Sequence, residues 1–388
     1  MPFCRTKCSY CNFASDVFSN NVFDAYVSRV CDDIAKSRSV AVDAAATVER
    51  EVDSIFLGGG TPSILAPVQL ERIFATLHDH FEVVPNAEIT VEVAPGTLNM
   101  GMLSTLMGVG VNRVSLGVQS FVDQESRAVG RLHTRQTTLD DILRLRRSGI
   151  DNLNVDLIAG LPHQTAESWE QSLRDVVATG VPHVSVYMLE VDEDSRLGQE
   201  LIAGGTRYHA HFVPNDDAVA DFYLAACEQL DAAGVMQYEI SNFARASCES
   251  RHNLKYWTRQ PYLGFGVDAH SMLLVPGGAV RLAMPDSLEA FTAGNTSPTV
   301  TRIDSRGALE EEFFLGLRLN RGVDLDALND RFGIALKHHE AALSELIADG
   351  LLVLDASRIR LTTRGRLLSN EVFQRFLEVA PADQPRVM

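Results

Sequence analysis

Apolar residues recur along this chain with two different spacings. A spacing of three and four residues, as in Phe23, Val27, Val30 and Ile34, is typical of amphipathic helices, whereas short apolar runs such as the one ending at Leu57 are typical of strands. The two patterns alternate between residues 20 and 190. They predict strands at 53–57, 87–93, 112–118, 151–157 and 183–189, and helices at 20–37, 67–80, 97–108, 122–129, 136–149 and 165–179. This alternation predicts an α/β fold with a parallel sheet.

Weaker patterns flank this region and extend beyond it. The alanine-rich stretch 37–50 predicts a helix end and a surface loop, and the polar segment 277–305 predicts a link to a second domain. That domain is expected to be mostly helical, with helices at 307–319, 336–348 and 364–376 and strands at 351–354 and 358–362. We therefore expect four parts: 1–240, the main domain; 241–305, a motif segment and linker; 306–378, the C-terminal domain; and 379–388, a disordered tail.

Polar residues stand at the carboxyl ends of the five predicted strands. They are Thr61, Glu92, Gln119, Asp156 and Glu190. Each has an ordinary structural explanation, such as an ion pair between Asp156 and Arg131. In a barrel, however, the carboxyl ends of all strands form one rim, where binding and catalytic groups gather. The five side chains together therefore predict a site at that rim.

Three of the six cysteines lie close together, at Cys4, Cys8 and Cys11. Thiolate ligands favour zinc or iron-sulfur clusters over hard cations. No fourth cysteine or histidine follows within ten residues, so the pattern predicts a metal group with one open position. The alternatives are a structural zinc site completed by a distant residue such as His252, or three unliganded cysteines. The other three cysteines are scattered, which argues against a disulfide framework and indicates a reducing compartment.

A run of glycines follows the first predicted strand, at Gly58, Gly59 and Gly60, and continues as Thr61-Pro62. Successive glycines let the backbone approach a ligand closely and leave N–H groups free for a carboxylate. The run lacks the Gly-Lys-Ser/Thr ending of a P-loop and the glycine spacing of a dinucleotide-binding turn. It predicts close contact with some other small ligand.

Composition excludes several partners. The 388 residues carry 34 Lys and Arg against 51 Asp and Glu, a net charge of -17, which repels nucleic acid and anionic lipid surfaces. No apolar run reaches the 18 residues of a membrane span, and no secretory leader opens the sequence. We expect a cytoplasmic protein with no stable membrane insertion and no nucleic-acid partner.

Taken together, these motifs resemble those of the radical S-adenosylmethionine (SAM) superfamily. The resemblance rests on the Cys4-x3-Cys8-x2-Cys11 loop, the glycine run, Arg113-Val-Ser-Leu-Gly-Val-Gln-Ser-Phe121 and Asp156-Leu-Ile-Ala-Gly-Leu-Pro162. It implies a partial (β/α)6, TIM-like barrel in which the three cysteines hold a [4Fe-4S] cluster whose open iron binds SAM. The residues it implies for SAM binding are Tyr10, Gly59, Gly60, Thr61, Glu92, Gln119, Arg131 and Asp156, the last three on the adenosine side or in a second SAM pocket. Glu190 has no counterpart in this pattern and is a weaker candidate.

Within the superfamily, the motifs look like the branch that contains oxygen-independent coproporphyrinogen III dehydrogenase and the HemW-type heme chaperones. The dehydrogenase carries another cysteine two positions after its third, where this chain has Phe13. His252-Asn253-Leu-Lys-Tyr256-Trp257 looks like the HNxxYW signature of the chaperones, associated with heme handling. An imidazole can bind heme iron, and Tyr256 and Trp257 offer apolar faces to a porphyrin. The structural alternative is an internally hydrogen-bonded histidine beside two core aromatics, and a second alternative is a thiolate ligand from Cys248.

The resemblance also sets expectations for both ends of the chain. Relatives have a barrel strand before the cysteine loop, including a tyrosine that helps to hold SAM, and only Met1, Pro2 and Phe3 precede Cys4 here. We expect either a translation start further upstream or a barrel that lacks its first strand. The C-terminal domain resembles the helical, winged-helix-like domain of the family and is expected to pack over the barrel mouth.

The expected function is therefore that of a heme chaperone that binds a [4Fe-4S] cluster, SAM and heme and passes heme to recipient hemoproteins, respiratory ones among them. The alternative is a dehydrogenase that generates a radical from SAM and oxidatively decarboxylates coproporphyrinogen III in porphyrin biosynthesis. A third reading, of another class, is a zinc-stabilised scaffold without redox chemistry.

Overall fold

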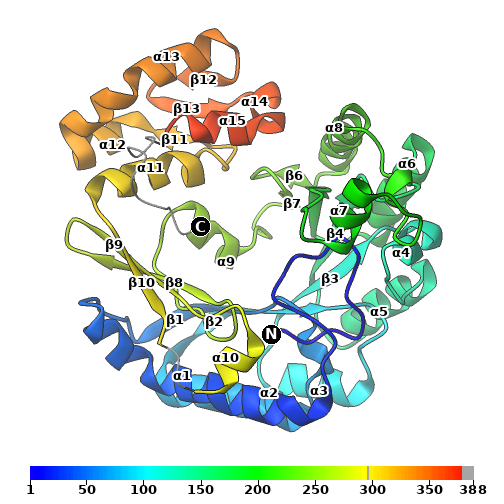
Figure 1. Cartoon of the computed structure of the whole chain (residues 1–388). Coiled ribbons are helices and arrows are strands. Elements are labelled where there is room, and N and C mark those ends of the chain that lie inside the picture. Colours follow the sequence, from blue (N-terminus) through cyan, green and yellow to red (C-terminus); the bar gives the residue numbers. More distant parts are fainter. Residues whose placement is uncertain (295–296, 378–388) are drawn as a thin grey trace.

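The computed structural model describes residues 1–294 and 297–377, and a seven-stranded sheet lies at its centre (Figure 1). The strand order is β1-β2-β3-β4-β5-β7-β6, and β1 to β5 are parallel to one another. The strands are β1 (Glu51–Leu57), β2 (Glu82–Val93), β3 (Arg113–Gln119), β4 (Asn152–Ala159), β5 (His183–Met188), β6 (Met236–Gln237) and β7 (Asn242–Ala244). The predicted α/β class with a parallel sheet is confirmed. The last two strands are short and antiparallel, a detail that the barrel pattern did not predict.

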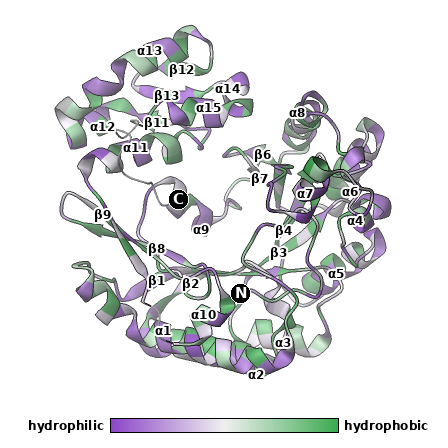
Figure 2. Cartoon of the chain, viewed as in Figure 1, coloured by the Kyte–Doolittle hydropathy of each residue, from purple (hydrophilic) through white to green (hydrophobic). Residues whose placement is uncertain are grey.

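Helices cover the outer face of this sheet. They are α1 (Phe23–Asp43), α2 (Pro67–His80), α3 (Met100–Gly108), α4 (Asp123–Ala128), α5 (Arg135–Arg147), α6 (Ala166–Thr179) and α8 (Asp216–Ala232), whereas α7 (Arg196–Ala203) lies beside the cysteine loop, where the Leu197 N–H donates to the Ser9 carbonyl. In Figure 2 these helices carry both hydrophilic and hydrophobic residues, as expected for helices with one buried face. Alternation along the strands places apolar side chains such as Val114 and Leu116 in the core beneath the helices. The polar side chains between them face inward, and they build the site.

Two features of the first 50 residues differ from the prediction or extend it. Helix α1 continues to Asp43 instead of ending near residue 37, because Ala41 is buried against Leu273 and Val280. Next to β1, which is the last strand at one edge of the described sheet, Met1 to Phe3 lie beside the glycine run. The Met1 ammonium donates to the Gly58 carbonyl at 2.9 Å, and the Gly60 N–H donates to the Met1 carbonyl at 2.6 Å.

The segment predicted as a polar link is ordered instead. It contributes to an antiparallel sheet of β8 (His270–Val275), β9 (Gly278–Ala283) and β10 (Thr299–Ile303), together with the short helix α10 (Leu288–Thr292). One face of this sheet is apolar, with Leu273, Val280 and Leu282 packed on the end of α1. The polar residues that suggested a loop occupy the other face. Apolar and polar residues alternate along a strand in this way when one face of the sheet is exposed.

The C-terminal domain has its own core, which includes Phe313, Leu346 and Ile359. It contains α11 (Ser305–Gly316), β11 (Val323–Asp324), α12 (Leu325–Phe332), α13 (Glu340–Ala348), β12 (Leu352–Asp355), β13 (Arg358–Leu361), α14 (Thr363–Leu367) and α15 (Ser369–Gln374). The predicted tail, 379–388, lies outside the described residues. In the part of the chain that the structure describes, no helix is both long and apolar enough to cross a membrane.

The C-terminal domain packs against α9 (Arg251–Trp257), and the expectation that it covers the barrel mouth is wrong. A buried ion pair joins Arg259 to Glu311, with Nε 2.6 Å from Oε2, and the Arg318 guanidinium lies 4.4 Å from the centre of the Trp257 ring. Helix α9 itself caps the amino ends of the barrel strands, because its first turn hydrogen-bonds Glu88 near the start of the inward-facing part of β2. The second domain therefore lies at the end opposite the cysteine loop.

Candidate functional site

A cavity of about 870 Å³ extends through the inside of the barrel. The cysteine loop and the carboxyl ends of β1 to β5 surround its mouth, and Arg113 and Asn253 lie at its floor. Among the described residues, none that follows Asn253 in the sequence lines this cavity. It contains all of the rim residues singled out from the sequence: Thr61, Glu92, Gln119, Asp156 and Glu190. The structure therefore brings together side chains from five strands, as the strand-end pattern predicted.

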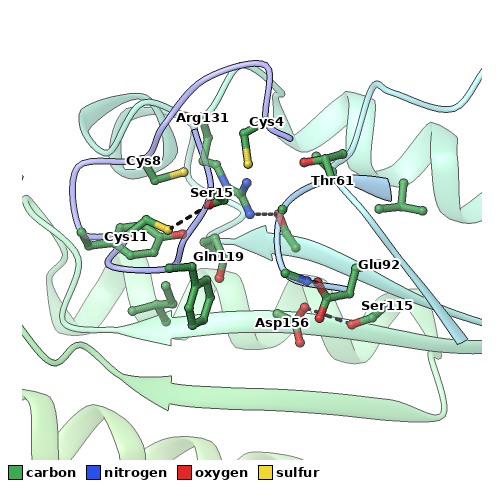
Figure 3. Close-up of a pocket in the computed structure, with 18 of the residues that line it drawn as sticks. Cys4, Cys8, Cys11, Ser15, Thr61, Glu92, Ser115, Gln119, Arg131 and Asp156 are labelled. Atoms are coloured by element: carbon green, nitrogen blue, oxygen red, sulfur yellow. Dashed lines mark hydrogen bonds between the residues drawn. The ribbon is translucent and has the colours of Figure 1, made fainter. Parts of the chain in front are cut away.

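The cysteine loop is held over this mouth by backbone hydrogen bonds to distant segments. The Cys4 N–H donates to the Asp16 carbonyl at 3.0 Å, the Ser9 N–H to the Val129 carbonyl at 3.2 Å, and the Leu197 N–H to the Ser9 carbonyl at 2.8 Å. Figure 3 shows the sulfur atoms of the three cysteines on the side of the loop that faces the cavity. Burial raises the pKa of the Cys4 thiol, and the neighbouring thiols Cys11 and Cys8 raise it further. The three sulfurs thus lie near enough to interact electrostatically.

The spacing of the thiols distinguishes two kinds of metal group. Among the described residues, no three Cys, His, Asp or Glu side chains are close enough to hold one metal ion. A single zinc ion, with bonds of about 2.3 Å to sulfur, needs its thiolates within about 4 Å of each other. In a cubane cluster each thiolate binds a different iron atom, so the sulfurs stay further apart. As they are placed, the thiols do not enclose a single ion, and three thiolates are the protein donor set of a cluster with one open iron.

The glycine run forms the wall of the mouth beside the cysteine loop. Gly59 has a φ of +104°, which few side chains tolerate, and its N–H donates to Glu92 Oε2 at 2.8 Å. A Cβ atom on Gly60 would lie 2.6 Å from the Phe3 carbonyl oxygen and 2.8 Å from that of Met1. Both glycines are therefore needed for the backbone to approach the loop, and their position next to Thr61 leaves this wall free of bulky side chains.

Glu92 is the acidic group of this wall. Burial raises its pKa to about 7, with a smaller contribution from the charge of Asp156, while the Gly59 N–H opposes the shift. A carboxylate in such a place gains from a positively charged ligand, because a nearby cation favours its ionised form. Glu92 is therefore suited to bind an ammonium group in the cavity.

Gln119 and Arg131 line the other side of the mouth, and Asp156 lies below it, near Glu92 (Figure 3). Gln119 has a φ of +70°, and its buried Oε1 has no partner in the described chain. Arg131 donates to the Gly117 carbonyl at 2.6 Å, and no ion pair within 4 Å joins it to Asp156 among the described residues. Unpartnered groups and an unusual backbone conformation are features that a bound ligand would explain.

Asp156 lies deeper in the cavity. Its carboxylate accepts hydrogen bonds from the Ser115 hydroxyl at 3.0 Å and the Asn154 amide at 2.8 Å, and burial raises its pKa. Tyr10, from the cysteine loop, lines the same cavity, and burial raises its phenol pKa as well. All of the SAM candidates therefore surround one space.

Several residues of this cavity were missed from the sequence. They are Arg113, Ser115, Asn154, Ser185 and Tyr187. All lie on β3, β4 or β5 and belong to the row of alternate side chains that faces inward. The two-residue period of a strand would therefore have found them. Thr97 and Asn253 also contribute, and no comparable pattern marks them.

The candidates on α9 are placed differently from those at the mouth. His252 Nδ1 lies 3.0 Å from the Ser54 hydroxyl, and its Nε2 lies 2.9 Å from the Tyr256 hydroxyl. The imidazole stacks on Phe56, with ring centres 5.2 Å apart, and burial lowers its pKa to about 4. Trp257 faces Arg318 of the C-terminal domain. As it stands, His252 thus makes internal hydrogen bonds with both ring nitrogens.

His252 and Tyr256 border a second hollow, of about 800 Å³, between the free edge of β1 and the β8 strand. Phe13 and Phe56 line both this hollow and the main cavity. Cys248 lies in the loop before α9, so a thiolate ligand from it would come from outside the helix that carries His252. The α9 candidates therefore lie beside, and partly beneath, the space surrounded by the cysteines.

Comparisons with known proteins agree with this arrangement. A family model described as the radical SAM superfamily matches residues 1–176, and one described as the HemN C-terminal domain matches residues 303–368. The chain is 32% identical over 383 residues to the heme chaperone HemW of Lactococcus lactis, covering 97% of this chain and 96% of that protein. It is 30% identical over 379 residues to the heme chaperone HemW of Escherichia coli, with the same two coverages.

A solved structure supports the fold. The coproporphyrinogen III oxidase HemN from Escherichia coli, a radical SAM enzyme, aligns with a TM-score of 0.82 over 97% of this chain and 88% of that one. The two are 24% identical in sequence, so this likeness is evidence for the architecture alone.

Proposed function

Because the chain belongs to the HemW-type family of radical SAM proteins, we propose that it is a heme chaperone that holds a [4Fe-4S] cluster and SAM, binds heme and delivers it to recipient hemoproteins. The observation that carries the proposal is the convergence of three free thiols and the polar rim on one cavity. We further propose that it works in the cytoplasm, where a thiol-held cluster is compatible with the reducing conditions.

At the mouth, Cys4, Cys8 and Cys11 would hold three irons of the cluster, whose remaining iron supplies a site for the amino and carboxylate groups of SAM. Glu92 would then bind the ammonium group, held in place by the Gly59 N–H. Gly59, Gly60 and Thr61 would allow the methionyl part of SAM to lie against backbone. Tyr10, Gln119, Arg131 and Asp156 would contact the remainder, and the unpartnered Gln119 Oε1 would accept a hydrogen bond from it.

At α9, His252 would provide an imidazole for heme iron, with Tyr256 and Trp257 beside the porphyrin. The lowered pKa of His252 keeps the ring neutral at physiological pH, which is the form that binds iron. Binding would require the ring to give up the hydrogen bond from one nitrogen, either to Tyr256 or to Ser54. Heme uptake therefore involves a local rearrangement of α9 in this proposal.

The alternative function is oxidative decarboxylation of coproporphyrinogen III. The residue that bears on it is Phe13, which lines the cavity where the dehydrogenase pattern has a cysteine. Phenylalanine cannot supply a thiol to a radical reaction or to a metal. This absence of a thiol favours the chaperone over the dehydrogenase.

A heme titration of anaerobically reconstituted protein, run beside a coproporphyrinogen assay, tests the proposal. We expect stoichiometric heme binding and no consumption of coproporphyrinogen. The His252→Ala variant should bind heme about tenfold or more weakly while keeping its iron and sulfide, since loss of an axial ligand removes one strong bond. The exposed His338→Ala serves as the matched control. Turnover of coproporphyrinogen would establish the alternative, and superimposed titrations of His252→Ala and wild type would assign His252 a structural role.

A further inference from the structure

One charged group at the floor of the cavity has no role in the proposed function. Arg113 is the first residue of β3 and is 2% exposed, and it borders the cavity. Its Nε is buried without a partner, and no hydrogen bond or ion pair joins its guanidinium to another described side chain or carbonyl. A guanidinium stays protonated in proteins, so this is a buried, unpaired positive charge.

A buried charge without a counter-ion is unfavourable, and the rest of the molecule shows how such a charge is normally compensated. Arg259 is 6% exposed, and its Nε lies 2.6 Å from Glu311 Oε2. Glu311 also pairs with Arg281 at 2.7 Å. The chain therefore pairs its buried arginine at the domain interface, whereas Arg113, like Arg131 at the mouth, faces the cavity without an ion pair among the described residues.

The carboxylates nearest to Arg113 are engaged by other groups. Glu88 accepts hydrogen bonds from the Arg251 and His252 N–H groups, both at 3.0 Å. Asp156 accepts from Ser115 and Asn154 and lies beyond ion-pair distance of Arg113; burial raises its pKa, and the charge of Arg113 opposes part of that rise. The negative charges of these two acids compensate the charge of Arg113 at longer range, but the acids accept no hydrogen bond from its guanidinium N–H groups.

Other groups facing Arg113 are neutral. Burial, with a smaller contribution from the charge of Arg113, holds the pKa of His183 well below its usual range. The Tyr238 hydroxyl lies 2.9 Å from His183 Nε2, and the pKa of Tyr238 is raised by burial. Asn253 reaches the floor from α9, and the structure gives its side-chain amide no hydrogen bond within the described residues. The floor therefore presents one cation and one free amide, together with the hydroxyls of Ser115 and Ser185, to the cavity.

We propose that Arg113 and Asn253 form a binding subsite for a carboxylate of a ligand that reaches the floor of the barrel. A guanidinium binds a carboxylate through two parallel N–H···O bonds, and the Asn253 amide can donate a third. A singly charged carboxylate fits better than a phosphate dianion, because Glu92 and Asp156 border the same cavity. The subsite also explains why the HNxxYW segment brings its asparagine to the cavity while His252 faces away from it.

Two ligands of the proposed function carry such a group: heme, through its propionates, and a second SAM molecule, through its methionyl carboxylate, since the carboxylate of the SAM on the cluster is engaged at the mouth. The identity of the ligand, though not the subsite itself, rests on that proposed function. The two sources can be separated because esterification removes the heme carboxylates and leaves SAM unchanged.

The test uses Arg113→Met and Arg113→Lys in the full chain, with Arg259→Met as the matched control. For cluster-free protein we expect Arg113→Met to melt no lower than wild type, since it removes an uncompensated charge, and Arg259→Met to melt lower, since Glu311 loses a partner. Acetate, as the simplest carboxylate, should raise the melting temperature of wild type more than that of Arg113→Met, with chloride at equal ionic strength as the reference. A lower melting temperature of Arg113→Met together with no difference in the acetate effect would overturn the subsite.

In reconstituted protein, the affinities of wild type and the Arg113 variants for heme, its dimethyl ester and SAM identify the ligand that supplies the carboxylate. If it is a propionate, wild type binds heme about tenfold or more tightly than heme dimethyl ester, Arg113→Met binds both equally, and Arg113→Lys recovers part of the difference. If it is the carboxylate of SAM, Arg113→Met lowers SAM affinity about tenfold and leaves the ester comparison unchanged. Unaltered affinities for both ligands in Arg113→Met would refute the subsite, whereas failure of wild type to bind heme at all would refute the proposed function and leave the acetate result standing.

Discussion

The mouth of the barrel and the surroundings of His252 on α9, at the amino ends of the strands, use polar side chains in opposite ways. At the carboxyl ends of the strands, Gln119 and Arg131 keep unpartnered atoms, Gly59 and Gln119 have positive φ, and Glu92 has a raised pKa. At the amino ends, α9 places His252 between Ser54 and Tyr256 so that both of its nitrogens are engaged.

The difference shows which of these two regions is preorganised to bind a ligand. A site with unpaired groups and strained backbone is ready for a ligand, because the ligand satisfies what the protein leaves open. A helix whose side chains bond to the sheet and to the second domain stabilises the fold, and it binds a ligand only by exchanging those bonds. The mouth should therefore respond to mutation mainly in binding, and α9 in both stability and binding.

The largest effect is expected at the cysteine loop. Cys8→Ser should lose the iron-sulfur cluster completely, because two thiolates cannot hold a cubane. Iron and sulfide analysis after anaerobic reconstitution, with the absorbance near 400 nm, measures this. The control is Cys31→Ser, since Cys31 is buried in the apolar core and faces no cavity residue of the mouth. Stoichiometric iron and sulfide in Cys8→Ser would contradict the assignment.

The next effect concerns the glycine wall. Gly60→Ala places a Cβ atom 2.6 Å from the Phe3 carbonyl oxygen, so the backbone must shift and we expect SAM affinity to fall tenfold or more, with a loss of about 2 kcal/mol of stability. Gly108→Ala is the matched control: its Cβ would meet no atom within 4 Å at the end of α3, and it should stabilise the protein by up to about 1 kcal/mol. Isothermal titration and urea unfolding of the two variants measure both effects. Equal SAM affinity in the two variants would remove the glycine wall from the site.

A third effect is a pair of opposite pH dependences in cluster-free protein. Glu92 has its pKa raised to about 7, so its ionisation disfavours folding, and wild type should lose stability relative to Glu92→Gln as pH rises from about 4.5 to 7. His252 has its pKa lowered to about 4, so wild type should lose stability relative to His252→Gln as pH falls from about 6.5 to 4. Each difference is worth up to about 3 kcal/mol, at 1.4 kcal/mol per pKa unit.

Urea unfolding at pH 5, 6, 7 and 8 compares the three proteins. The Glu92 difference should be largest at pH 8 and the His252 difference largest at pH 5. If both differences changed in the same direction with pH, the contrast between the two ends would be wrong.

The residues around the mouth could be predicted from the sequence because the pattern that marks each of them lies within a short stretch of the chain. Thr61, Glu92 and Asp156 each lie shortly before or after the carboxyl end of a strand with a clear apolar pattern, and parallel strands bring their carboxyl ends to one rim whatever the details of packing. The motif residues of the cysteine loop follow each other within eight positions. The order of elements is therefore enough to place these groups around one space.

The other end could not be predicted in the same way. Arg113 and Asn253 are far apart in sequence, and their meeting at the floor depends on the path by which α9 returns beneath the sheet. The hydrogen bonds of His252 to Ser54 and Tyr256 leave no trace in hydrophobic periodicity. The antiparallel sheet β8-β9-β10 was read as a link for a related reason, since its polar face conceals its apolar one.

The most direct test of the central claim, that this protein carries heme and hands it on, is heme transfer from the loaded protein to an apo-hemoprotein. Anaerobically reconstituted wild type, loaded with one heme, is mixed with apomyoglobin, and the Soret spectrum of the separated acceptor is recorded against free heme and against Cys8→Ser. We predict transfer from wild type, slowed or absent in Cys8→Ser. Retention of heme by the wild-type protein under all conditions, together with consumption of added coproporphyrinogen, would contradict the account.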